Sequence, residues 1–167
     1  ILVVPEGFNS ETIKMFKFTV KASKIIKKKK FIFRFHPMMD KKFFFENLSI
    51  DIKKIPKNLI FSESTFKKDV EKSSYIIYRG SAASIQALSS GVIPIYLKLE
   101  NEINIDPLYM LKKKFYVSNV NDLNKILDNK NTNKLNKKNI FFTKEYFDKP
   151  NYKVLIDYLN KLNDEKI

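Results

Sequence analysis

The rarest residue types in this chain gather at two short sites. The 167 residues include two arginines, one histidine and three glycines. Arg34 and His36 stand two positions apart, and Arg79 is followed directly by Gly80 and Ser81. Guanidinium, imidazole and hydroxyl groups all donate hydrogen bonds, and a neighbouring glycine lets a ligand approach the backbone closely. These residue types therefore predict a site for an anion, and a phosphate fits it best.

His36 has the widest chemical range of these residues. An imidazole can donate a hydrogen bond to a phosphate, or it can protonate a departing phosphate as a general acid. The alternative is a surface histidine in the turn that Pro37 imposes. Because Arg34 lies two residues earlier on the same strand face, we assign His36 the catalytic role and Arg34 a substrate-binding role.

Gly80 and Ser81 lead into a predicted helix of small residues that runs from Ala82 to Ser90. The start of a helix offers free N–H groups and a positive dipole end, which favour a phosphate. Ser81 and Ser84 add hydroxyl donors. Ser81 could instead serve only as the N-cap of this helix, and both interpretations stay open. We count Arg79, Gly80, Ser81 and Ser84 as candidate substrate-binding residues.

Carboxylates follow two of the predicted strands. Glu6, with Gly7 behind it, comes after the first strand, where it could orient a sugar, act as a base or cap the next helix. A loop with Glu100, Glu102 and Asp106 follows the fifth strand, in the right place to bind sugar hydroxyls, although such a loop can also be merely solvated. We expect Glu6, Gly7 and Asp106 to contact substrate.

Strands and helices alternate along the chain. Apolar runs predict six strands, at residues 1–4, 31–35, 59–62, 75–78, 93–97 and 115–117. Helical patterns predict one helix from Asn9 or Ser10 to the lysines at 27–30, and others at 65–72, at 82–90, after Ser118 or Asn119, and from Asn151. Residues 40–57 are irregular or weakly helical, and residues 129–139 form a polar loop. The last helix should bury a stripe made of Tyr152, Leu155, Ile156, Leu159 and Leu162.

This alternation predicts an α/β fold, with an open parallel six-stranded sheet and helices on both faces, as in Rossmann-like domains. In such sheets, ligands bind outside the carboxyl ends of the strands. The arginines, the histidine and two of the three glycines all lie at or just after the carboxyl ends of strands, so the fold should bring them to one edge.

The composition excludes several classes of protein. Without cysteine the chain has no disulfide scaffold, thiolate metal site or cysteine nucleophile. No apolar run approaches the roughly 20 residues of a membrane span, and no signal-peptide pattern opens the chain. Nucleotide-binding P-loop and GxGxxG motifs, a GxSxG elbow and paired acidic metal ligands are also absent from the sequence. We therefore expect neither a metal nor a cofactor.

The net charge of +14 comes almost entirely from lysine, since all but two of the 32 basic residues are lysines. Readers of nucleic acids favour arginine for bidentate contacts to bases and phosphates. The lysine excess therefore argues against nucleic acid as the main partner. It favours a solvated surface that can attract an anionic membrane or an anionic substrate.

The stretch from Tyr78 to Ile95 resembles the C-terminal, donor-binding domain of GT-B glycosyltransferases, whose signature reads G-[ST]-x-x-x-x-E-A-x-x-x-G-x-P-x-[IV]. Residues 33–37, Phe-Arg-Phe-His-Pro, resemble the R-x-H-P element of bacterial capsule and surface-polysaccharide enzymes, including sialyltransferases and teichoic-acid glycerophosphotransferases. The resemblance implies that His36 and Ser81 contact the donor phosphate. Gln86 stands where many of these enzymes bind ribose with a glutamate, and its amide can still bond a hydroxyl, although less strongly.

The resemblance implies transfer of a sugar from a nucleotide-activated donor during surface-polysaccharide synthesis, either of capsule or of lipopolysaccharide. Its partners would be a nucleotide sugar and a glycan or lipid-linked acceptor, in the bacterial cytoplasm or at the inner membrane. A glycerophosphotransferase is the nearest alternative, a sugar-nucleotide epimerase is more distant, and a non-catalytic module that binds nucleotide or polysaccharide belongs to another class. Because an apolar run opens the chain, we expect residues 1–167 to be one nucleotide-sugar-binding domain of a longer protein, without its N-terminal acceptor domain.

Overall fold

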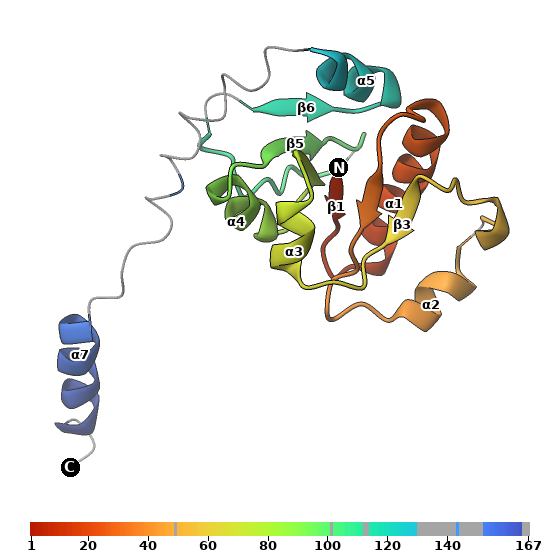
Figure 1. The fold of residues 1–167 in the computed structure, drawn as a ribbon. Coiled ribbons are helices and arrows are strands. Elements are labelled where there is room, and N and C mark those ends of the chain that lie inside the picture. Colours follow the sequence, from red (N-terminus) through yellow and green to blue (C-terminus); the bar gives the residue numbers. More distant parts are fainter. Residues whose placement is uncertain (49, 101, 112–113, 130–142, 144–151, 165–167) are drawn as a thin grey trace.

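The computed structural model describes residues 1–48, 50–100, 102–111, 114–129, 143 and 152–164. Six strands form one sheet in the order β3-β2-β1-β4-β5-β6, and every neighbouring pair is parallel. The strands are β1 (Leu2–Val4), β2 (Phe31–Phe33), β3 (Leu59–Phe61), β4 (Tyr75–Tyr78), β5 (Ile93–Leu97) and β6 (Phe115–Val117). The open, Rossmann-like α/β fold predicted from the sequence is confirmed (Figure 1).

Helices cover both faces of this sheet because the strands are apolar on both sides. Val3 packs into one core layer, whereas its neighbours Leu2 and Val4 pack into the other. The first layer includes side chains of α1 (Asn9–Ile25), α2 (Lys41–Glu46) and α5 (Val120–Asp128). The second includes side chains of α3 (Phe66–Glu71) and α4 (Ala83–Ser89). A short 3-10 helix, η1 (Ile52–Lys54), precedes β3.

Several local features follow the sequence closely. The bounds of β4, β5 and β6 are those predicted, and β2 and β3 are shorter than predicted at their carboxyl ends. Thr65 caps α3 and Asn119 caps α5, each by accepting a hydrogen bond from a backbone N–H three residues later. Gly91 follows α4 with φ of 87°, a backbone conformation that favours glycine, so it ends that helix as expected.

The two ends of α1 differ from the prediction. Neither Asn9 nor Ser10 caps the helix. Its N-cap is Phe8, whose side chain cannot accept a hydrogen bond from the first backbone N–H groups. Thr12 instead turns back, and its hydroxyl donates to the carbonyl of Phe8 at 2.9 Å. At the other end, α1 stops at Ile25, so the lysines at 27–30 lie in the following turn and not in the last turn of the helix.

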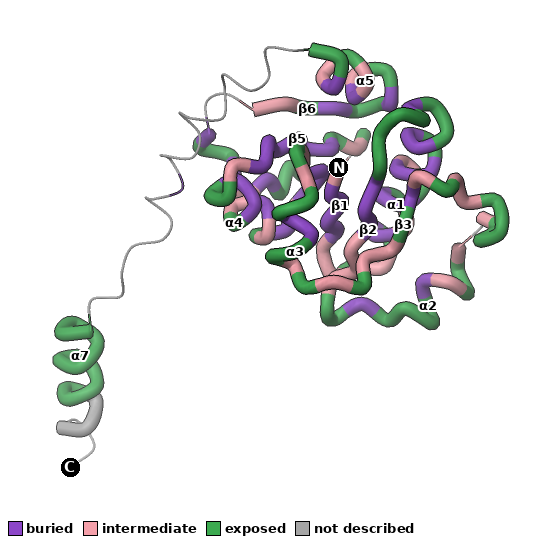
Figure 2. Tube along the Cα trace, viewed as in Figure 1, coloured by how far each residue is buried: buried purple, intermediate pink, exposed green. Residues whose placement is uncertain are grey.

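The predicted buried stripe on the last helix is wrong for the side chains that the structure describes. Helix α7 (Tyr152–Asp164) forms, but the exposed fractions of Tyr152, Leu155, Ile156 and Leu159 lie between 50 and 68% (Figure 2). Apolar residues at helical spacing show that a helix has a face to bury, but not what buries it. The side chain of Leu162 and residues 130–139 of the predicted polar loop lie outside the described part. None of the described helices is long and apolar enough to cross a bilayer.

Candidate functional site

A pocket of about 640 Å³ opens at the carboxyl edge of the sheet, where the loops after β1, β2 and β4 meet. We call it the edge pocket. Strands β1 and β4 are neighbours, but β1 leads into α1 on one face and β4 into α4 on the other. This reversal is the place where open α/β sheets bind ligands. The lining residues are Glu6, Gly7, Phe8, Arg34, His36, Pro37, Met38, Phe66, Gly80, Ser81, Ala82, Ala83 and Gln86.

The edge pocket contains seven of the ten residues that the sequence marks as candidates. They come from three loops and one helix, and they are Glu6, Gly7, Arg34, His36, Gly80, Ser81 and Gln86. Arg79, Ser84 and Asp106 do not line it. Phe66, Phe8 and Met38 are pocket residues that the sequence did not single out, since an isolated apolar side chain in a loop or at the start of a helix carries no such signal.

The ring of His36 is oriented by its own turn. Its Nδ1 accepts a hydrogen bond from the backbone N–H of Met38 at 3.2 Å, so in the neutral imidazole the proton lies on Nε2. The ring also lies against Gly7: a Cβ at that position would come within 3.1 Å of Nδ1. Gly7 therefore makes room for the histidine, and Nε2 is left as a hydrogen-bond donor.

Arg34 is held by the segment after β3. Its Nη1 donates to the hydroxyl of Ser62 (3.2 Å), the carbonyl of Ser64 (2.7 Å) and Oδ2 of Asp69 (2.8 Å). Asp69 is buried on α3, so the ion pair fixes one end of the guanidinium while about a quarter of the arginine side chain stays exposed. This arrangement gives the edge pocket a positive charge in a defined position.

Glu6 and Gly80, which both line the edge pocket, touch each other. A Cβ at position 80 would lie only 1.3 Å from Oε1 of Glu6, so the carboxyl group occupies the space that a side chain would need. Burial raises the pKa of Glu6, whereas the charge of Arg79 and a hydrogen bond from the Gly80 backbone act in the opposite direction. Oε1 is buried and has no hydrogen-bond partner among the described residues, so this oxygen is closed to a ligand while the two loops keep their contact.

Two serines near the start of α4 have different roles. The N-cap of α4 is Ala82, which makes no side-chain cap, so the interpretation of Ser81 as the capping residue is wrong. Its side chain lines the edge pocket instead. Ser84 is fully buried, and its hydroxyl donates to the carbonyl of Ser81 at 2.9 Å. Ser84 therefore stabilises the turn that carries Ser81, without reaching the edge pocket.

Arg79 points away from the edge pocket, because successive side chains along a strand alternate between faces and Tyr78 occupies the α4 side. Its Nη2 pairs with Glu102 at 2.9 Å, its Nε lies 3.8 Å from Glu11, and its Nη1 donates to the carbonyl of Leu97 at 3.1 Å. The side chain is only 3% exposed. Arg79 thus pairs with the buried Glu11 and the partly exposed Glu102, and it borders a separate cavity of about 320 Å³.

Glu11 is a buried acid that the sequence analysis missed. Burial and the nearby carboxylate of Glu6 raise the pKa of Glu11 to about 7, although Arg79 opposes the shift. Glu102 is different, because a hydrogen bond from Lys14 and the charge of Arg79 lower the pKa of its carboxyl group. The signal was available: Glu11 stands four residues before the buried Met15, on the apolar stripe of α1.

Asp106 does not reach the edge pocket either. Its Oδ1 accepts hydrogen bonds from the hydroxyl of Tyr78 and the backbone N–H of Leu108, both at 2.9 Å, and its Oδ2 pairs with Lys114. The carboxylate is fully buried, and burial together with this carboxylate raises the pKa of Tyr78. These contacts of Asp106 hold the loop after β5 in place. Asp106 is therefore not a substrate-binding residue of the edge pocket.

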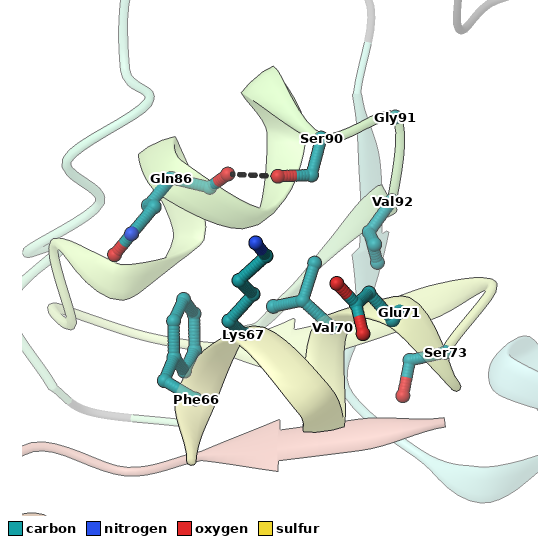
Figure 3. A pocket seen from close by; sticks show the side chains of 9 residues that line it. All are labelled: Phe66, Lys67, Val70, Glu71, Ser73, Gln86, Ser90, Gly91 and Val92. Atoms are coloured by element: carbon teal, nitrogen blue, oxygen red, sulfur yellow. Dashed lines mark hydrogen bonds between the residues drawn. The ribbon is translucent and has the colours of Figure 1, made fainter.

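A further pocket of about 460 Å³ lies between α3 and α4 (Figure 3). Figure 3 shows Lys67 extending from α3 into this space, opposite the carbonyl of Gln86, which accepts a bond from the Ser90 hydroxyl at 3.2 Å. Phe66 and Gln86 line both this pocket and the edge pocket, so the two are neighbours. Among the described residues, no group of three or more histidine, aspartate or glutamate side chains could hold a metal ion.

Comparison with known proteins shows a likeness of structure only. No protein-family profile and no curated protein sequence matches the chain. The glycosyltransferase SnogD from Streptomyces nogalater superposes with a TM-score of 0.52 at 15% identity, over 86% of this chain and 37% of its own. The glycotransferase of kitacinnamycin superposes with a TM-score of 0.57 at 9% identity, over 83% of this chain and 38% of its own. The chain therefore shares its fold with part of each enzyme and spans under two-fifths of their length.

Proposed function

We propose that this chain is the donor-binding part of a glycosyltransferase that uses a nucleotide-activated sugar. The observation that carries the proposal is the edge pocket, which assembles the residues of both sequence motifs, Arg34 with His36 and Gly80 with Ser81, at the switch point of the sheet. The fold supports it, because two glycosyltransferases share that fold over most of this chain.

The donor phosphate would lie between the loops after β2 and β4. Nε2–H of His36 and the hydroxyl of Ser81 would donate to its oxygens, and the guanidinium of Arg34 would balance its charge. When the bond between the sugar carbon and the phosphate oxygen breaks, that oxygen keeps the electron pair. For His36 to act as general acid, its ring would carry a proton on each nitrogen, Nδ1 would no longer accept the bond from Met38, and Nε2 would give its proton to that oxygen.

The other parts of the donor would extend to either side. Gln86 and Phe66 border both the edge pocket and its neighbour. The Gln86 amide would bind ribose hydroxyls, and the Phe66 ring would pack against the base. The carboxyl group of Glu6, which lines the edge pocket, would accept a hydrogen bond from a hydroxyl of the sugar. Gly7 would contribute by keeping the His36 ring in place.

The biological setting rests on the resemblance of residues 33–37 to surface-polysaccharide enzymes. We place the reaction in capsule or lipopolysaccharide synthesis, in the bacterial cytoplasm or at the inner membrane. The acceptor would be a glycan or a lipid-linked sugar. Its site and the catalytic base would belong to a further domain, in line with the small share of the neighbouring enzymes that this chain spans.

Nucleotide binding tests the proposal. Titration calorimetry with CMP, UDP and CDP would compare the wild type with His36→Ala and Ser81→Ala, and with Ser74→Ala as a control before β4. We expect each pocket variant to weaken the best nucleotide by at least tenfold, about 1.4 kcal/mol, and the control to bind as the wild type does. The assignment of the phosphate site is wrong if neither pocket variant weakens nucleotide binding tenfold.

A further inference from the structure

The amino ends of β2 and β3 carry a dense set of lysines. Residues 24–30 lead from α1 into β2, and residues 51–57 lead through η1 into β3. Together they contain one acidic residue, Asp51, and eight lysines, all exposed: Lys24, Lys27, Lys28, Lys29, Lys30, Lys53, Lys54 and Lys57. We call these two segments the lysine surface. Because all strands are parallel, it lies at the opposite edge of the sheet from the edge pocket.

The two segments of the lysine surface are fastened together. The side-chain amide of Asn58 donates to the carbonyls of Ser23 at 3.0 Å and Lys29 at 2.9 Å, and the backbone N–H of Phe31 donates to the carbonyl of Asn58 at 2.8 Å. These bonds hold the turn before β2 against the segment before β3. The lysines therefore belong to one surface of fixed shape.

The charge of this surface is largely uncompensated. Among the described residues, only Lys54 has a carboxylate partner within it, Asp51 at 3.9 Å. Two large apolar side chains stand among the lysines, since Ile25 is 55% exposed and Ile52 is 51% exposed. Clustered cations with exposed aliphatic groups are suited to an anionic bilayer, where lysines meet phosphates and the apolar groups enter the interface.

A nucleic-acid surface would be built differently. Arginine is the residue that reads bases and phosphates bidentately, and neither arginine of this chain lies on the lysine surface. Arg34 is paired with Asp69 beside the edge pocket, and Arg79 is buried against Glu102. The available cations are thus lysines, which act as point charges without base specificity.

We infer that the lysine surface binds an anionic lipid bilayer. This inference deepens the proposed location at the inner membrane and rests on it, but it does not depend on sugar transfer. The bound orientation has one consequence for the proposed reaction: the edge pocket faces away from the lipid, so nucleotides from solution can still enter it.

Vesicle sedimentation tests the inference. The protein would be mixed with vesicles of phosphatidylcholine alone, or of phosphatidylcholine with phosphatidylglycerol. One variant carries Lys27→Gln, Lys28→Gln, Lys29→Gln and Lys30→Gln. A matched control removes four exposed charges from α3, its C-terminal end, α5 and α7, by Lys68→Gln, Lys72→Gln, Lys125→Gln and Lys153→Gln. Circular dichroism would verify that both variants fold.

We expect salt-sensitive binding to the anionic vesicles only, weakened by at least about tenfold in the first variant and by less than about threefold in the control. Equal losses in the two variants would overturn the inference, because net charge alone would then drive binding. A lack of binding by the wild type would overturn both the inference and the membrane location. Competition by a duplex oligonucleotide at physiological salt, lost in the first variant, would assign the surface to nucleic acid instead. Nucleotide titration of the same proteins reports on the edge pocket separately.

Discussion

The carboxyl group of Glu6 lies where a side chain at position 80 would begin, because a Cβ on Gly80 would come within 1.3 Å of Oε1. The two residues follow neighbouring strands, β1 and β4, whose register pairs Val4 with Tyr78. The loops after these strands therefore interlock, and the glycine is required by a specific partner. This contact also places a carboxyl group beside the site that we assign to the donor phosphate.

A methyl group at position 80 tests the interlock. Gly80→Ala should cost about 1–3 kcal/mol of unfolding free energy, because Glu6 must leave its place or strain the loop. The cost should fall sharply when Glu6→Ala is already present, since the space is then empty. Urea unfolding of the wild type, both single variants and the double variant measures this coupling. Additive costs would mean that the two residues do not compete for the same space.

Removing the charge of Glu6 should change the preference of the edge pocket for ligands. Glu6→Gln should tighten the binding of a plain nucleoside diphosphate by about three- to tenfold, because a carboxylate no longer opposes the phosphate. The affinity for a nucleotide sugar should rise by less, since the amide of Gln is a weaker acceptor than the Glu6 carboxylate for a sugar hydroxyl. Titration calorimetry at about pH 8 would compare the two ligands, with Glu63→Gln as an exposed control. Weaker binding of the plain nucleotide would contradict the placement of the phosphate.

The ion pair between Arg34 and Asp69 should act on stability and on binding together. Asp69→Asn should lower the free energy of unfolding by about 1–3 kcal/mol, because it weakens a buried, charge-assisted contact. It should also weaken nucleotide binding, since the guanidinium loses its fixed position. Arg34→Lys should also weaken nucleotide binding, because an ammonium group that kept these three contacts would have no N–H left for a ligand, whereas the guanidinium has two further nitrogens. Normal nucleotide affinity in both folded variants would remove Arg34 from the site.

The buried carboxyl of Glu11 should make stability depend on pH. Its pKa is about 7 in the folded chain against an ordinary value of 4.5, so between these values the folded state holds a proton that the unfolded state has lost. Its contribution to stability therefore falls as pH rises through this window, by at most about 3 kcal/mol, and levels off above it. Urea unfolding across this range should show a shallower pH dependence for Glu11→Gln than for the wild type. Identical slopes would place the Glu11 pKa near its ordinary value.

The placement of site residues at strand ends could be predicted because it needs only the positions of the strands. Once β2 and β4 are located, a parallel sheet brings the residues after them to one edge, and the edge pocket does contain His36 and Ser81. The direction in which the Arg79 side chain points was harder to predict. Its position at the end of β4 is correct, but its side chain turns toward Glu11 and Glu102, and those acids come from α1 and the loop after β5.

Tertiary partners decided the other errors as well. Asp106 follows β5 as expected, but it is bound by Tyr78 and Lys114, which stand 28 and 8 positions away in the sequence. The apolar side of α7 was recognised correctly as a helical face, but its exposure depends on what else is present. Periodicity and capping report on a segment and its neighbours in sequence. They contain no information on which distant acid meets which distant base.

The sheet also limits how copies of this chain can associate. Within the described residues, its two edges are β3 and β6, and each is only three residues long. A second copy that aligned with either edge would form only a short ladder of backbone hydrogen bonds. Long, flat edge strands, in contrast, allow many copies to pair and aggregate. The edge strands are themselves apolar, Leu-Ile-Phe in β3 and Phe-Tyr-Val in β6, so their composition does not prevent such pairing. Their shortness is what limits edge-to-edge aggregation.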